Sequence, residues 1–170
     1  MRYSIDQDQT EHFDKAGTLT LEMPLSDADK AILDPKLPPF NPWTQSGPLR
    51  KFIFNRQRAE IASQLFDAPM LRLGYALLTA NLHNYNLEKS CCLQGAIGTL
   101  TIDLENPDHI IIKNKYAPHN IENLSLIIVY CTETIIFKNN KADPFFNYIK
   151  AEGKAYGDHL QADHHPYLIK

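Results

Sequence analysis

The sequence predicts a mixed α and β fold in which strands dominate, an α+β class. Residues 126–130 form an unbroken apolar, β-branched run, the pattern of a strand that is covered on both faces. Helix signals lie early in the chain and strand signals late, so helices are expected to pack on one sheet. The chain of 170 residues, 44% of them hydrophobic, is long enough for a single domain with a sizeable core.

The first elements follow from local signals. Ser4–Gln7 has the pattern of a capping box, which predicts a helix from there to Ala16 with Gly17 as its left-handed stop. Residues 18–22 alternate between polar and apolar, as a half-buried strand does. A second capping box at residues 26–29 predicts another short helix.

The middle of the chain opens with a proline-rich loop over residues 35–48, which contains five prolines and the only tryptophan, Trp43. Such a loop cannot join a sheet ladder, but its aromatic anchor is expected to pack on the body. Residues 51–54 are interpreted as a strand end, and Asn55 as the cap of the next helix. Residues 81–90 are expected to be a polar loop.

The second half is expected to supply most of the sheet. Glycines at 95 and 98 suggest a bulge in one of its strands. His119 lies in a polar crossing between two others, and the polar tail at 153–170 is expected to form no long element. Strands are predicted over residues 70–80, 91–103, 109–113 and 124–137, followed by a short helix over 143–149.

Charge and cysteine usage narrow the class of protein. The net charge of −3 argues against a broad phosphate-binding surface, so nucleic acid is an unlikely partner. Cys91, Cys92 and Cys131 have the distribution of reduced, packed thiols in a cytosolic protein. The start lacks the apolar segment of a signal peptide, and no run reaches membrane-spanning length. A cytoplasmic protein without membrane contact is therefore expected.

Two histidines are candidate metal ligands, His83 at an expected strand end and His119 in the polar crossing. A non-haem iron site needs two imidazoles and a carboxylate on one face of the metal. His83 is followed by Asn84 and Tyr85, so the carboxylate is missing, and the single literal His-x-Asp, at His12, falls in the first helix. The alternative is that His83 and His119 are ordinary loop histidines.

The arginine distribution bears on a keto-acid cosubstrate, whose far carboxylate is normally held by a bidentate arginine on a late strand. No arginine follows Arg72. Lys138 is the late-strand candidate for binding such a cofactor, although its ammonium matches a carboxylate less well. Two parts of one site are missing, so no catalytic residue is assigned.

Two further clusters have alternative interpretations. The tail could hold a divalent metal or simply be a solvated tail; its candidate ligands are Asp158, His159, Asp163, His164 and His165. A basic group could contact nucleic-acid phosphates or simply be a solvated face; it consists of Arg50, Lys51, Arg56 and Arg58.

Three segments together resemble the phytanoyl-CoA dioxygenase-like branch of the Fe(II)/2-oxoglutarate-dependent oxygenases. They are residues 8–26, the His119 crossing with the strand that ends at Tyr130, and residues 143–166 with Asp143-Pro144 and His165-Pro166. The resemblance implies a double-stranded β-helix (jelly-roll) core with the N-terminal and central helices packed on one sheet. Of the iron-ligand positions of that family, the resemblance implies counterparts only at His83 and His119.

The leading hypothesis is therefore a single jelly-roll domain over residues 1–170 that has lost its catalytic iron site. It would act as a binding or interaction module for an unknown small molecule or protein, with no cofactor expected. One alternative is an active oxygenase that uses Fe(II) and 2-oxoglutarate with atypical ligands around His83 and His119. The other is a DNA-binding regulator that responds to a divalent metal bound by its tail.

Overall fold

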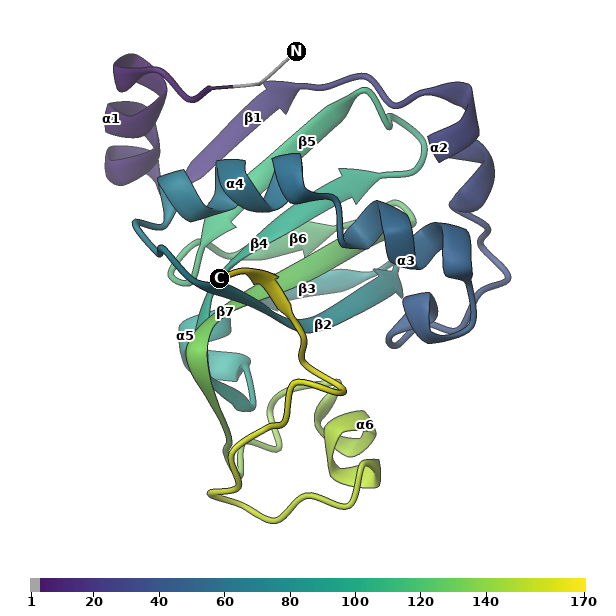
Figure 1. The fold of residues 1–170 in the computed structure, drawn as a ribbon, viewed down its shortest axis with the longest axis vertical. Helices are drawn as coiled ribbons and strands as arrows, with labels where there is room; N and C mark the ends of the chain where they lie inside the picture. The colour runs from purple at the N-terminus through teal and green to yellow at the C-terminus, as the bar shows by residue number, and fades with distance from the viewer. Residues whose placement is uncertain (1–3) are drawn as a thin grey trace.

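The computed structural model describes residues 4–170, and within them the fold is mixed α and β, mainly β, as predicted (Figure 1). A curled, six-stranded antiparallel sheet has the order β1-β5-β4-β7-β2-β8, and a second sheet pairs β3 with β6. The strands are β1 Thr18–Glu22, β2 Leu71–Thr79, β3 Leu82–Tyr85, β4 Leu93–Asp103, β5 His109–Asn114, β6 His119–Ile121, β7 Ser125–Phe137 and β8 Tyr167–Ile169.

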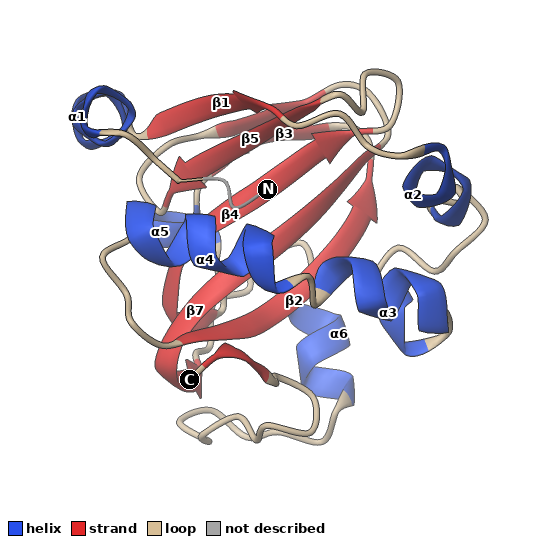
Figure 2. Ribbon diagram, turned by 45° about the horizontal axis from the view of Figure 1, so that its top comes forward, coloured by secondary structure: helices blue, strands red, loops and turns tan. Residues whose placement is uncertain are grey.

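Helices α3 and α4 cross one face of the large sheet (Figure 2). The buried side chains of α1, α3 and α4 share one apolar cluster with that face, as expected for helices that pack on a sheet. Those of α5 and α6 belong to a second cluster. The helices are α1 Gln7–Ala16, α2 Asp27–Ile32, α3 Gly47–Ile53, α4 Arg56–Leu65, α5 Leu87–Ser90 and α6 Phe146–Ala151, with a 3₁₀ turn at Pro42–Thr44.

Strand β7 separates two apolar clusters. Leu126, Ile128 and Tyr130 belong to the cluster on the helical side. Ile127 and Val129 belong to the other cluster, which also contains side chains of the small sheet. Alternate residues of a strand point to opposite faces, so this run is buried on both sides, and its prediction is confirmed.

Other sequence-based predictions need correction. Helix α1 is capped by Asp6, whose carboxylate accepts from the Gln9 amide at 2.8 Å, rather than by Ser4. Residues 51–54 are mostly helical, because Ser46 caps α3 and its apolar residues follow a helical spacing. Residues 81–90 form β3 and α5 instead of a loop. The crossing that contains His119 is partly strand β6.

Several details are confirmed. Trp43 is buried, so the proline-rich loop does pack on the body. The register of β4 against β7 shifts between Gln94 and Ala96 and again before Gly98, as the two glycines suggested. The three cysteines are free and buried. None of the helices in the described part of the chain has the length and apolar character needed to cross a bilayer.

The C-terminal tail folds back over the ends of β2 and β7. It pairs with them through β8 and through an isolated bridge from Ile136 to His159. Arg72, which is 5% exposed, donates from its guanidinium to the backbone carbonyls of Glu133, Leu160 and His165 at 2.8–2.9 Å. A single arginine thus joins β2 to β7 and to two points of the tail. The jelly-roll topology itself stays a prediction.

Candidate functional site

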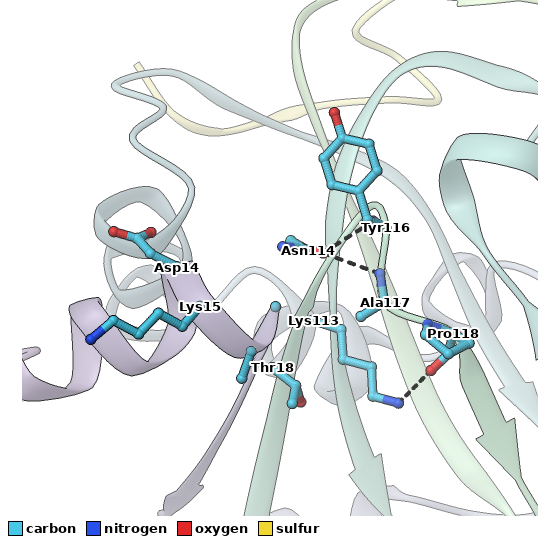
Figure 3. Close-up of a pocket in the computed structure, with 10 residues that line it drawn as sticks. Asp14, Lys15, Thr18, Lys113, Asn114, Tyr116, Ala117 and Pro118 are labelled. Atoms are coloured by element: carbon cyan, nitrogen blue, oxygen red, sulfur yellow. Dashed lines mark hydrogen bonds between the residues drawn. The ribbon is translucent and has the colours of Figure 1, made fainter.

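A surface groove of about 500 Å³ lies between the end of α1, the start of β1 and the turn after β5 (Figure 3). This volume falls in the range of small-molecule sites. Its lining combines charged and polar side chains with apolar ones and includes an exposed tyrosine. The lining residues are Asp14, Lys15, Ala16, Gly17, Thr18, Lys113, Asn114, Tyr116, Ala117 and Pro118.

Lys113 contributes an ammonium group to the lining of the groove. Its ammonium donates to the Pro118 carbonyl at 2.7 Å, a bond that Figure 3 shows as a dashed line. No carboxylate within residues 4–170 lies within ion-pair distance of it. Burial of the side chain lowers the pKa of Lys113 because the charged form loses hydration. An acidic ligand would compensate this charge.

Asn114 holds the turn beside Lys113. Its Oδ1 accepts from the amides of Tyr116 and Ala117 at 3.0 and 3.1 Å, while its Nδ2 has no acceptor among the described residues. Gly17, left-handed at φ 70°, lets the end of α1 approach closely, since an added Cβ would lie 2.9 Å from that Nδ2. The groove is therefore lined by a free amide donor and by an ammonium without an ion pair.

His119 lies in the interior between the two sheets, 0% exposed. Its Nε2 lies 2.7 Å from the Thr99 hydroxyl, and its Nδ1 lies 3.2 Å from the Tyr85 carbonyl. Because a carbonyl can only accept, Nδ1 carries the proton and Nε2 accepts from Thr99. Burial, and secondarily the charge of Lys113, lowers the pKa of His119 to about 4, so the ring is neutral near pH 7.

Acidification is expected to destabilise the fold through His119. In the unfolded chain the imidazole has its ordinary pKa of 6.5, against about 4 in the fold. The unfolded state takes up the proton first, so stability falls as the pH drops from about 6.5 to about 4, by about 3 kcal/mol in all.

Urea unfolding at several pH values in this range tests the effect. The matched variant is His119→Gln, whose side chain cannot titrate and should lose less stability on acidification. Equal pH-dependent losses in both proteins would show that another group is responsible.

The structure separates the other predicted site residues. His83 is exposed on β3, the strand that pairs with the β6 strand of His119. Lys138 is half-buried after β7 and lines a different hollow of about 350 Å³ together with Glu88 and Lys115. These three residues are not brought to one site, and their predicted roles stay predictions.

The two alternative clusters are also dispersed. In the tail, His165 is buried with its Nδ1 against the Gly74 carbonyl. Asp158, His159, Asp163 and His164 are exposed. Within residues 4–170, no group of three or more His, Cys, Asp or Glu is placed to hold a metal.

In the basic group, Arg58 is buried, stacks on Phe52 and donates to its carbonyl at 3.0 Å. Arg50 lies over Trp43 and Phe54. Both side chains are therefore engaged with aromatic residues of their own fold.

Sequence reasoning missed a buried polar cluster in the same interior. The hydroxyls of Tyr75 and Tyr85 lie 2.6 Å apart and 3.4–3.5 Å from Asp143. Asp143 also accepts from the amides of Cys92 and Phe145 at 2.7 and 2.9 Å. Burial raises the pKa of both tyrosines. The only sequence signal was the turn at Asp143-Pro144, because the other partners come from distant segments.

No protein-family model and no curated protein matches the sequence. Several solved structures are similar to the structure of this chain. SnoK, a non-heme alpha-ketoglutarate-dependent carbocyclase from nogalamycin biosynthesis, matches with a TM-score of 0.75 at 12% identity, over 98% of this chain and 97% of SnoK. The epimerase SnoN matches with a TM-score of 0.70 at 13% identity, over 95% and 98%.

CT296 from Chlamydia trachomatis matches with a TM-score of 0.58 at 17% identity, over 77% of this chain and 97% of CT296. At these identities the comparisons show the fold alone. The chain has a fold like that of the non-heme alpha-ketoglutarate-dependent enzymes SnoK and SnoN.

Proposed function

We propose that this chain is a jelly-roll domain of the 2-oxoglutarate-oxygenase type that has lost catalytic metal binding and serves as a small-molecule binding module. The proposed loss of metal binding rests on the hydrogen bonding of His119. Both of its ring nitrogens are engaged by Thr99 and Tyr85 within a buried interior.

The donor set does not fit a non-haem iron site. Such a site needs free lone pairs from two imidazoles and a carboxylate. Coordination by His119 would require one of its two hydrogen bonds to break, and exposed His83 is followed by Asn84 rather than an acid. The neighbouring interior is occupied by Tyr85, whose ring packs edge-on to His119, and by the tyrosine–aspartate cluster. The phytanoyl-CoA branch suggested by the sequence remains part of this proposal.

The groove of Figure 3 is the proposed ligand site. Its volume suits a small molecule, and the ammonium of Lys113 and the free amide nitrogen of Asn114 favour a carboxylate or phosphate group. Binding there needs no metal and no opening of the packed interior.

Anaerobic titration with Fe(II) and 2-oxoglutarate tests the loss of metal binding. No stoichiometric metal-to-ligand charge-transfer band is expected. A band that disappears in His119→Ala would overturn the proposal. Because His119 is buried, His83→Ala serves as a second variant that leaves the packing intact, and a band that depends on His83 would have the same meaning.

A thermal-shift screen of small carboxylates and phosphates tests the groove. Compounds that stabilise the protein should lose their effect in Lys113→Met and keep it in Lys36→Met, a lysine outside the groove. Stabilisation that persists in Lys113→Met would place binding elsewhere.

The alternative function is an active oxygenase, which is favoured by the similarity to SnoK and SnoN. SnoN has a structure in complex with Fe3+, alpha ketoglutarate and nogalamycin RO. Oxygen uptake coupled to 2-oxoglutarate consumption by this chain would establish that alternative.

A further inference from the structure

The C-terminal tail, yellow in Figure 1, runs from the end of α6 back to the large sheet, where β8 pairs with β2. His165 lies in this tail shortly before β8, and it is 0% exposed. Neither the proposed ligand groove nor the hydrogen bonds of His119 involve this histidine. Because buried polar groups are nearly always paired, the partners of the His165 ring show what holds it inside.

One ring nitrogen of His165 is committed to strand β2. Nδ1 lies against the Gly74 carbonyl. Because a carbonyl oxygen can only accept, Nδ1 carries a hydrogen and donates it. The backbone of His165 is fixed as well, since its carbonyl accepts from Arg72 Nε at 2.8 Å and its amide donates to the Gln161 carbonyl at 3.1 Å. The ring is therefore held in one position, with a hydrogen on Nδ1.

The other ring nitrogen of His165, Nε2, faces a carboxylate. It lies 3.4 Å from Oε2 of Glu152, the residue that ends α6. Both atoms are buried, and neither makes a hydrogen bond with the residues that the structure describes. A neutral ring would turn a bare lone pair toward a carboxylate oxygen and leave two buried acceptors unsatisfied. A hydrogen on Nε2 removes this conflict and turns the approach into a charge-assisted contact.

The charges on the neighbouring elements leave Glu152 as the counter-ion of His165. On β2, the Arg72 guanidinium donates to three backbone carbonyls and forms no ion pair within residues 4–170. On β7, the Cys131 thiol lies close to Gly74 and is neutral, because burial raises its pKa. No other acid, lysine or histidine of α6, β7 or the tail is fully buried; those nearest to the pair in the sequence are Lys150, Lys154, Asp163 and His164.

We propose that His165 is an imidazolium in the folded chain, clamped between the Gly74 carbonyl and the Glu152 carboxylate, and that its proton is a pH-sensitive latch for the C-terminal tail. Histidine is the side chain whose charge changes most readily near neutral pH. While the ring is charged, both of its nitrogens donate and the latch is closed. When the pH rises and the proton leaves, Nε2 becomes an acceptor that faces a carboxylate, and the contact between α6 and the tail is lost.

The latch is independent of the proposed ligand groove, because the two share no residue. The hydrogen bonds of Arg72 do not depend on the proton of His165, so the tail is loosened at high pH and the sheet beneath it stays intact.

Nitrogen-15 NMR of the full chain with labelled histidine reads the protonation of each ring nitrogen. At about pH 6, both nitrogens of His165 should carry a hydrogen, and Glu152→Gln should convert the ring to the neutral form with a hydrogen on Nδ1 only. The glutamine amide can donate to Nε2, so this variant keeps the contact without the charge. Glu133→Gln is the matched control, because it removes an exposed acid of β7 and should leave His165 charged.

Limited proteolysis of residues 153–170 reads the latch itself. At about pH 9, the tail of the native protein should be cleaved at least about fivefold faster than that of Glu152→Gln, since only the native protein loses a contact to a charged group. At about pH 6 the two rates should agree. Comparing the two proteins at one pH cancels the pH dependence of the protease, and the thermal midpoint verifies that each variant is folded.

Three results would reject the latch. One is a bare ring nitrogen on His165 in the native protein at about pH 6. Another is a charged ring that Glu152→Gln leaves unchanged, because a different group would then hold the proton. The third is equal cleavage of the native protein and Glu152→Gln at about pH 9, which would show that the proton does not control the tail.

Discussion

Replacing Arg72 with methionine is expected to lower the free energy of unfolding by about 3–5 kcal/mol. The guanidinium donates to three backbone carbonyls on β7 and in the tail, at Glu133, Leu160 and His165. Hydrogen bonds from a charged donor contribute about 1.5–3 kcal/mol each, and unpaired buried carbonyls add a desolvation cost. Methionine fills a similar space but donates nothing, so all three carbonyls lose their partner.

Urea unfolding measures the Arg72 effect, and proteolysis of residues 153–170 reports whether the tail is released. Arg56→Met is the matched control. Its side chain is 82% exposed and pairs with Glu60 on the same helix, so it should change stability by less than about 0.5 kcal/mol. An Arg72→Met protein with native stability and a protease-resistant tail would show that the tail is held by other contacts.

Replacing Gly98 with alanine is expected to cost about 2–3 kcal/mol. A Cβ at this position would lie 2.2–2.3 Å from two ring atoms of Phe66 and 2.6 Å from the Lys113 carbonyl. The Phe66 ring could turn aside, but the carbonyl belongs to the neighbouring strand β5 and can move only with its ladder. Overpacking of this kind typically costs 1–3 kcal/mol.

The control for Gly98 is Gly47→Ala. Gly47 begins α3, and an added Cβ there meets nothing within 4 Å. Alanine at such a site should leave stability unchanged or raise it by up to about 1 kcal/mol. Equal unfolding midpoints for the two variants in urea would contradict the close approach of Phe66 and β5 to Gly98.

Local patterns were enough to predict much of the framework. The run at residues 126–130 is buried on both faces, and the caps Ser26 and Asn55 open helices where expected. These features depend on side-chain periodicity and on hydrogen bonds between residues three apart, which the sequence displays directly. Errors of local reasoning were also local, such as Asp6 replacing Ser4 as the first cap.

The candidate sites depend on contacts between distant segments. The polar neighbours of His119 in the sequence predict a loop residue. In the fold, both of its ring nitrogens are hydrogen-bonded, to Thr99 and Tyr85, which lie 20 and 34 residues earlier. The groove at Lys113 exists because the end of α1 lies against the turn after β5. The sequence by itself thus determined most of the strands and helices, but not β3, α5 or the helical state of residues 51–53. Only the tertiary structure decided which polar groups are paired and which are left free to bind, since hydrogen bonding and burial are set by partners that no local pattern identifies.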